Sequence, residues 1–146
     1  MGERSVLIGM SGGVDSSVTA FLLQQQGYRC VGCTMHLHSS PCGGEDNTKD
    51  ARSVADRLGI PFQEFDCMDT FSCRVIDGFI ASYEQGQIPN PCIECNRYLK
   101  FGAMLDNALA MGCGYVATGH YARIEQDPAT GRFLLKKAAD RAKDQT

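Results

Sequence analysis

Residues 5–17 read Ser-Val-Leu-Ile-Gly-Met-Ser-Gly-Gly-Val-Asp-Ser-Ser, an apolar run that passes directly into a polar, glycine-rich turn. Residues 5–10 have the length and composition of a buried strand. Helical spacing follows in residues 14–26, and Gly27 ends it. A glycine turn between a strand and a helix leaves backbone N–H groups free at the helix start, which favours an anion. The stretch therefore predicts a phosphate-binding turn at the edge of a sheet.

The rest of the chain alternates strand-like and helical segments. We expect further strands at residues 29–37, 60–66 and 114–119, and further helices at residues 48–58, 69–87 and 97–111. A loop is expected at residues 38–47, a segment that is not helical throughout at residues 88–96, and a hairpin at residues 121–136. This alternation predicts an α/β fold, a Rossmann-like doubly wound parallel sheet that binds ligands beyond the carboxyl ends of its strands.

Length, composition and charge narrow the class of protein. The 146 residues, 43% hydrophobic and 21% charged, fit one ordinary globular domain and exclude a disordered tail or a coiled coil. Because the sequence has neither a signal peptide nor the roughly 20 apolar residues of a membrane span, we expect a cytoplasmic protein. Residues 1–96 carry 6 basic and 12 acidic side chains, whereas residues 97–146 carry 8 and 5. Any face that binds nucleic acid should therefore lie toward the C-terminal end.

The residue types in the glycine turn suit a nucleotide. Gly12 and Gly13 allow a ligand to approach the backbone closely, and Ser11, Ser16 and Ser17 add hydroxyl donors. Asp15 would hold Mg²⁺ beside a phosphate. The Gly-Lys-Ser/Thr ending of a Walker A loop is absent. A plain turn without a ligand explains a lone glycine pair better than it explains this whole string after a strand.

A second motif, Asn90-Pro-Cys-Ile-Glu-Cys-Asn96, holds two cysteines three residues apart. Cys95 stands at the expected start of a helix, so the helix dipole should lower the pKa of its thiol and make it the most reactive of the eight cysteines. Cys92 is close enough to form a disulfide with an oxidised Cys95 or to share a metal with it. The alternative is half of a zinc site completed by Cys30 and Cys33. Those two lie three apart in a strand and should point to opposite faces.

A third motif, Tyr115-Val-Ala-Thr-Gly-His-Tyr-Ala-Arg123, ends an expected strand in a turn. Gly119 is a candidate for close approach of the backbone to a nucleotide. Two roles stay open for His120, which would act on phosphate or cap the turn. The last four residues, Lys143-Asp-Gln-Thr146, have the composition of a frayed polar end.

Together these strings resemble the tRNA-specific 2-thiouridylases of the MnmA/TrmU type, over essentially the whole chain. The resemblance implies the ATP pyrophosphatase (adenine nucleotide alpha hydrolase-like, HUP) fold and the use of ATP with Mg²⁺. It implies adenylation of the C2 oxygen of the wobble uridine, then sulfur transfer from a cysteine persulfide to give 2-thiouridine. The implied partners are tRNA and a persulfide donor, such as a cysteine desulfurase or a sulfur relay protein; no membrane is involved.

The resemblance also assigns roles to residues. Cys95 is implied to be the catalytic nucleophile that carries the persulfide. The residues implied to contact ATP are Gly9, Met10, Ser11, Gly12, Gly13, Val14, Asp15, Ser16, Met35 and Gly119. The residues implied to contact tRNA are Asn90, Pro91 and Cys92, at the target base, together with Lys143, Asp144 and Gln145.

Two features depart from the family. Many members have Asp at the position of Cys92, which makes metal or disulfide chemistry there more plausible. The family also continues beyond the Lys-Asp-Gln string with a second catalytic cysteine and further domains. Residues 1–146 are therefore expected to be the N-terminal ATP pyrophosphatase part, which alone does not complete tRNA thiolation.

Two other functions stay open. One is a different ATP pyrophosphatase that amidates or ligates a small substrate. The other is a zinc or iron–sulfur module built from the Cys-x-x-Cys pairs, for which Cys92 and Cys95 would supply two ligands.

Overall fold

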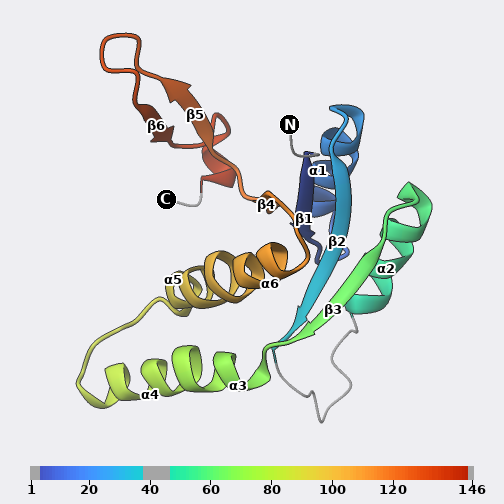
Figure 1. Cartoon of the computed structure of the whole chain (residues 1–146). Helices are drawn as coiled ribbons and strands as arrows, with labels where there is room; N and C mark the ends of the chain where they lie inside the picture. The colour runs from blue at the N-terminus through green and yellow to red at the C-terminus, as the bar shows by residue number, and fades with distance from the viewer. Residues whose placement is uncertain (1–3, 38–46, 145–146) are drawn as a thin grey trace.

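Four parallel strands form the central sheet of the structure, a computed structural model that describes residues 4–37 and 47–144. The strands are β1 (Ser5–Gly9), β2 (Arg29–His36), β3 (Phe62–Asp66) and β4 (Tyr115–Ala117). They lie in the order β3-β2-β1-β4, so β1 pairs with β2 on one side and with β4 on the other (Figure 1). The predicted parallel sheet is confirmed.

Helices connect the strands and cover both faces of the sheet (Figure 1). Two of them, α1 (Val14–Gln25) and α2 (Asn47–Leu58), pack on one face. The connection from β3 to β4 consists of α3 (Met68–Phe71), the π-helical segment η1 (Ser72–Ile76), α4 (Asp77–Glu84), α5 (Pro91–Cys95), the π-helical segment η2 (Asn96–Ala103) and α6 (Met104–Ala110). Because α6 packs on the opposite face from α1 and α2, the predicted doubly wound arrangement is confirmed.

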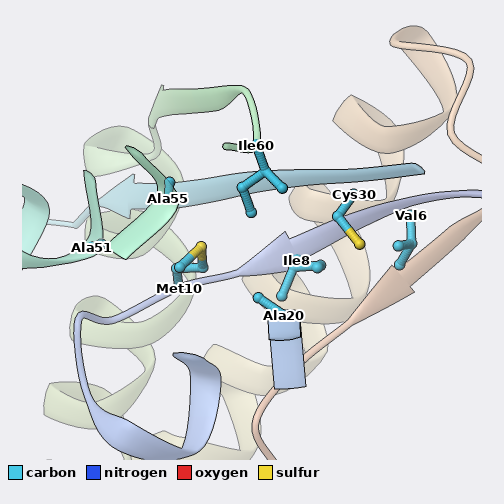
Figure 2. Close-up of a cluster of buried hydrophobic side chains, with 8 residues drawn as sticks. All are labelled: Val6, Ile8, Met10, Ala20, Cys30, Ala51, Ala55 and Ile60. Atoms are coloured by element: carbon cyan, nitrogen blue, oxygen red, sulfur yellow. The ribbon is translucent and has the colours of Figure 1, made fainter. Parts of the chain in front are cut away.

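Apolar clusters fill both faces of the sheet, and alternate residues of β1 divide between them. Val6 and Ile8 belong to the cluster under α1 and α2, whereas Leu7 belongs to the cluster under α6. Figure 2 shows the first cluster, which consists of Val6, Ile8, Met10, Ala20, Cys30, Ala51, Ala55 and Ile60. The second cluster consists of Leu7, Cys33, Met104, Ala108 and Cys113. The core is therefore centred on β1, the strand that leads into the glycine turn.

Four large apolar side chains of α1 lie exposed on its surface and not in the core. Their spacing indicated the helix correctly, but the four side chains are between 47% and 77% exposed: Val14, Val18, Phe21 and Leu22. The buried side of α1 instead carries Ser16 and Ala20. Such small side chains let the helix lie close to β1, which brings its first turn to the end of that strand.

The helix expected from residue 97 begins earlier, at Pro91. Asn90 caps it, because its side-chain oxygen accepts a hydrogen bond from the N–H of Cys92 at 3.0 Å. Proline is tolerated in the first turn of a helix, where its missing N–H has no intrahelical partner to lose. Pro91, whose presence predicted that residues 88–96 are not helical throughout, is therefore the first residue of a helix. The helix expected at residues 69–87 is found at residues 68–84, with η1 in its middle.

The expected hairpin is also present and stands apart from the main sheet (Figure 1). It pairs β5 (Arg123–Gln126) with β6 (Phe133–Lys136) in antiparallel register, and a short 3-10 helix, η3 (Arg141–Lys143), follows it. The loop expected at residues 38–47 falls almost wholly outside the described residues. Within residues 4–37 and 47–144, none of the helices has the length and apolar character needed to cross a bilayer.

Candidate functional site

The candidate site lies at the carboxyl edge of the sheet, between β1 and β4. From β1 the chain proceeds through β2 to β3 on one side, whereas the long crossover returns it to β4 on the other side of β1. Open α/β sheets bind ligands where the strand order reverses in this way. The glycine turn after β1 and the turn after β4 both open at this point, as the sequence predicted.

The glycine turn is shaped by its backbone and by serine hydroxyls. Gly12 has a φ of 76°, in the left-handed region that favours glycine. The hydroxyl of Ser16 donates to the carbonyl of Gly13 at 3.1 Å and accepts from the N–H of Ser11 at 3.3 Å. Gly13 is the N-cap of α1 and makes no side-chain capping bond to the first turn. The turn thus presents helix-start N–H groups and hydroxyls at one place, which suits a phosphate.

Gly119 lies against this turn from the β4 side. A Cβ atom at Gly119 would lie 3.0 Å from the backbone nitrogen of Ser16 and 3.2 Å from the carbonyl carbon of Asp15. Only glycine therefore lets the turn after β4 pack directly on the start of α1. This close approach to protein backbone explains the glycine, and its contact with a nucleotide stays a prediction.

His120 bonds within the turn that follows β4. Its Nδ1 lies 2.6 Å from the Oγ1 of Thr118, a side-chain contact within the turn, and both roles left open for this residue stay predictions. Burial, and then the Lys100 ammonium, lower the pKa of His120. Its ring also lies beside that of Phe101 in η2, with 6.2 Å between the ring centres.

Two residues distant in sequence hold the Asp15 carboxylate. The hydroxyl of Tyr121 donates to Oδ1 at 2.6 Å, and the ammonium of Lys143 donates to Oδ2 at 3.4 Å. The Tyr121 hydrogen bond, with a further contribution from Lys143, lowers the pKa of Asp15. The same hydrogen bond raises the pKa of Tyr121. An ionised carboxylate beside the phosphate-binding turn offers the oxygen ligands that Mg²⁺ prefers.

Sequence reasoning missed Tyr121 and the ion pair of Lys143 with Asp15. Tyr121 belongs to the third motif, two residues after Gly119, but the sequence gives it no partner. Only the pairing of β1 with β4 brings its hydroxyl to Asp15. The residues after Lys143 do not reach this carboxylate in the described part of the chain. Asp144 instead pairs with Lys137 at 3.4 Å, and Gln145 lies outside the described residues.

The remaining residues expected to contact ATP differ in exposure. Met10 is buried in the first cluster, and Met35, at the end of β2, is half-buried against the second. Gly9 passes close to Met104, whose sulfur would lie 3.2 Å from an added Cβ. Val14, by contrast, is exposed at the first position of α1. Contact of Gly9, Met10, Val14 and Met35 with a nucleotide stays a prediction.

Cys95 lies at the end of α5 and not at a helix start. The chain continues from α5 into η2, and Cys95 packs against a third apolar cluster, formed by Cys67, Val75 and Leu99. Burial raises the pKa of the Cys95 thiol, and the Lys100 ammonium acts in the opposite direction. The expectation that a helix dipole lowers the pKa of this thiol is therefore wrong, because the helix begins one turn earlier.

The other residues of the thiol motif lie on the surface. Asn90, Pro91 and Cys92 are exposed at the start of α5, and the first two line a hollow with Arg74 of η1 and Phe79 of α4. Cys92 and Cys95 are both free thiols. The hollow brings an arginine and an aromatic ring beside two of the three residues expected to face the target base, and Cys92 does not line it.

The four-cysteine zinc site does not assemble. Cys30 and Cys33 are buried in different clusters on opposite faces of the sheet, as the strand geometry predicted. Neither can join Cys92 and Cys95 around one ion. Across residues 4–37 and 47–144, no three His, Cys, Asp or Glu side chains are grouped in a way that could hold a metal.

Comparison with known proteins supplies a family. Residues 4–146 match the family model described as tRNA methyl transferase HUP domain. The chain is 50% identical over 152 residues to "tRNA-specific 2-thiouridylase MnmA" of Clostridioides difficile (strain 630), an alignment that covers 99% of this chain and 42% of that protein. It is 47% identical over 156 residues to the protein of the same name from Carboxydothermus hydrogenoformans, covering 100% and 43%. The chain thus spans less than half the length of these curated relatives.

The fold is similar to that of a solved structure. The crystal structure of a predicted subunit of tRNA methyltransferase from Methanocaldococcus jannaschii superposes with a TM-score of 0.56 at 21% sequence identity, covering 96% of this chain and 60% of that one. This likeness supports the α/β fold with a parallel sheet.

Proposed function

The chain belongs to the family of the tRNA methyl transferase HUP domain, and we propose that it forms the ATP-binding, thiol-bearing domain of a tRNA 2-thiouridylase. One observation carries the proposal: η2 connects the thiol segment, residues 90–96, with the carboxyl edge of the sheet where the two turns lie. Its Lys100 influences the pKa of both Cys95 and His120, and its Phe101 contacts the His120 ring. ATP-dependent sulfur transfer requires a site that binds the phosphates of ATP and a cysteine that carries the sulfur, and this chain has a candidate for each.

The turn after β1 would hold the pyrophosphate part of ATP. The N–H groups at the start of α1 and the hydroxyl of Ser11 are the donors for its oxygens, and the hydroxyl of Ser16 shapes the turn by donating to the carbonyl of Gly13. Asp15 fits as an oxygen ligand for Mg²⁺, because its carboxylate is ionised and partly exposed beside these donors. When bound, Mg²⁺ neutralises charge on the triphosphate.

The proposed substrate is the wobble uridine of a tRNA. Its C2 oxygen attacks the α-phosphate of ATP, pyrophosphate departs, and the oxygen can then leave carbon C2 as part of AMP. The terminal sulfur of a persulfide on Cys95 attacks C2 as AMP leaves, which joins Cys95 to the base through a disulfide. A second thiol then attacks the sulfur of Cys95, forms a disulfide with it and releases 2-thiouridine. Asn90 and Pro91, beside the hollow that includes Arg74, would face the base after it leaves the anticodon stack.

A persulfide donor protein and tRNA are the proposed partners, which places the reaction in the cytoplasm. The seven described cysteines are all free thiols, as a reducing compartment would keep them. An iron–sulfur cluster in place of the persulfide fits the described residues less well. Cys92 and Cys95 would supply two ligands, and no third His, Cys, Asp or Glu side chain is grouped with them in the described ranges.

The nucleotide site is tested by calorimetry with ATP and Mg²⁺. Asp15→Ala should weaken binding at least tenfold, about 1.4 kcal/mol, because it removes the carboxylate at the phosphate-binding turn. Asp106→Ala is the matched control, since Asp106 is likewise an acidic residue in the first turn of a helix. Unchanged affinity in Asp15→Ala would contradict the assignment of this residue.

The substrate class is tested by ATP cleavage. The proposal predicts that unmodified tRNA increases the release of AMP and pyrophosphate, and that Asp15→Ala loses the increase. If tRNA leaves the release of AMP unchanged and a small amine acceptor increases it, the result would favour an ATP pyrophosphatase that amidates or ligates a small substrate.

A further inference from the structure

The Asp15 carboxylate is shared between two donors of different character, one on each oxygen. We propose that Tyr121 is a positioning residue of the nucleotide site and that Lys143 is an exchangeable counter-ion that Mg²⁺ displaces from Asp15. The inference rests on the proposed function, because it assumes that the turn after β1 takes ATP with Mg²⁺.

Tyr121 is anchored close to the carboxylate that it contacts. It follows Gly119 by two residues, and Gly119 packs so tightly on the backbone of Asp15 and Ser16 that an added Cβ would lie 3.0 Å from the Ser16 nitrogen. The phenol is rigid, and its hydroxyl lies 2.6 Å from Oδ1. A short hydrogen bond to a charged acceptor is among the stronger ones in proteins. Tyr121 therefore restricts how the Asp15 carboxylate can turn.

Lys143 is held more loosely. Its ammonium lies 3.4 Å from Oδ2, its side chain is 48% exposed, and it reaches Asp15 from η3 over a flexible four-carbon stem. Exposed ion pairs of this kind contribute little to stability. The same ammonium lies 5.2 Å from the centre of the Tyr121 ring, so it keeps a second favourable contact when the ion pair breaks.

The two donors respond differently to a divalent cation. Mg²⁺ takes carboxylate oxygens as ligands and repels an ammonium on the same group. The cation therefore competes with Lys143 for Asp15, whereas the hydroxyl bond of Tyr121 to the other oxygen persists. The displaced ammonium stays near the turn and is available to an anion. Occupancy of the nucleotide site is in this way coupled to residues 140–144, which include two residues expected to contact tRNA.

A purely structural role for the network is the alternative. In that case Tyr121 and Lys143 tie η3 to the sheet, and their loss changes thermal unfolding but not the Mg²⁺ dependence of nucleotide binding. The two accounts differ in whether the effect of Tyr121 requires Asp15, which a double-mutant cycle measures.

The experiment measures the affinity for α,β-methylene-ATP, which is not cleaved between those phosphates, over a series of Mg²⁺ concentrations. Tyr121→Phe should weaken binding about fivefold, the worth of one hydrogen bond, and should have no effect when Asp15 is already Ala. Lys143→Met should lower the Mg²⁺ concentration for half-maximal binding about threefold, because an exposed competitor is removed. Tyr83→Phe, on an exposed ring that packs against Phe79, is the control and should match the unchanged protein.

The outcomes separate this inference from the proposed function. A loss in Tyr121→Phe that persists in the Asp15→Ala background would overturn the positioning role, as would no loss at all where Asp15→Ala weakens binding. A higher Mg²⁺ requirement in Lys143→Met would overturn its role as a displaceable counter-ion. Unchanged affinity in Asp15→Ala would overturn the proposed nucleotide site and this inference together. Thermal unfolding of each variant checks that it folds.

Discussion

The turn after β1 and the segment Asn90–Asn96 both join a polar stretch to a helix, yet the helix serves them differently. In the turn, α1 begins at Val14, so its first N–H groups lie where the phosphates of a nucleotide are predicted to bind. In the thiol segment, α5 begins at Pro91, and Cys95 lies at its end against an apolar cluster. The position of Cys95 within its helix thus leaves burial as the main influence on its thiol, whereas the turn keeps the free N–H groups of a helix start.

The largest expected effect tests whether the apolar cluster behind the thiol segment stabilises the fold, as the clusters on β1 do beneath the turn. Leu99 is fully buried in the cluster behind Cys95, so Leu99→Ala should lower the free energy of unfolding by about 2–5 kcal/mol. Leu109 is 62% exposed on α6, and Leu109→Ala should change it by less than about 0.5 kcal/mol. Urea unfolding measures both. Equal small losses would show that the third cluster does not support the thiol.

The next prediction concerns the contact between the two turns at the sheet edge. Gly119→Ala forces a Cβ to within 3.0 Å of the Ser16 nitrogen, so it should cost about 1–3 kcal/mol of stability and weaken ATP binding. Gly114→Ala is the control, because nothing lies within 4 Å of its added Cβ. Unfolding and calorimetry of the two variants decide the matter. If Gly119→Ala behaves like Gly114→Ala, the two turns are not in direct contact.

A third prediction ranks the thiols by environment. Burial raises the pKa of Cys33 to about 12, so this thiol stays protonated in the folded chain. Its contribution to stability is complete below the pKa of an ordinary thiol and falls as pH rises toward 12. Alkylation near pH 8 should therefore reach the exposed Cys73 and Cys92 first, Cys95 on the order of tenfold more slowly, and Cys33 last. Peptide mass mapping gives the order, and labelling of Cys95 ahead of Cys73 would restore the activated thiol that the sequence suggested.

The smallest effect concerns Lys100, whose ammonium lowers the pKa of the Cys95 thiol and so opposes the effect of burial. Removing the ammonium should raise the pKa of the Cys95 thiol further, so less thiolate is present at a given pH. We expect Lys100→Met to slow alkylation of Cys95 about twofold to threefold and to shift its pH profile upward. Arg97→Met is the control, because the Arg97 guanidinium lies over the ring of Tyr98. An equal change in both variants would point to a general loss of positive charge.

The sequence predicted what depends on neighbours along the chain. The apolar run of β1, the glycines after it and the opposite faces of Cys30 and Cys33 all follow from local patterns, and the structure has them. The environment of Cys95 did not follow, since it depends on where α5 begins and on Val75 from η1.

Contacts between distant residues were also beyond the sequence. Tyr121 and Asp15 are 106 positions apart, and they meet only because β4 pairs with β1 and not with β3. The sequence showed four strands but not their order. For the same reason, the ion pair between Lys143 and Asp15 could not be foreseen.

Sulfur mapping tests the central claim most directly, that Cys95 is the thiol that carries the sulfur. The chain is incubated with a cysteine desulfurase and cysteine, persulfides are trapped by alkylation, and the peptides are mapped by mass. The account predicts an added sulfur on Cys95, unchanged in Cys73→Ala and absent in Cys95→Ala, even though Cys73 is the more exposed thiol. Sulfur divided between Cys73 and Cys95 according to exposure, or retained on Cys92 in Cys95→Ala, would contradict it.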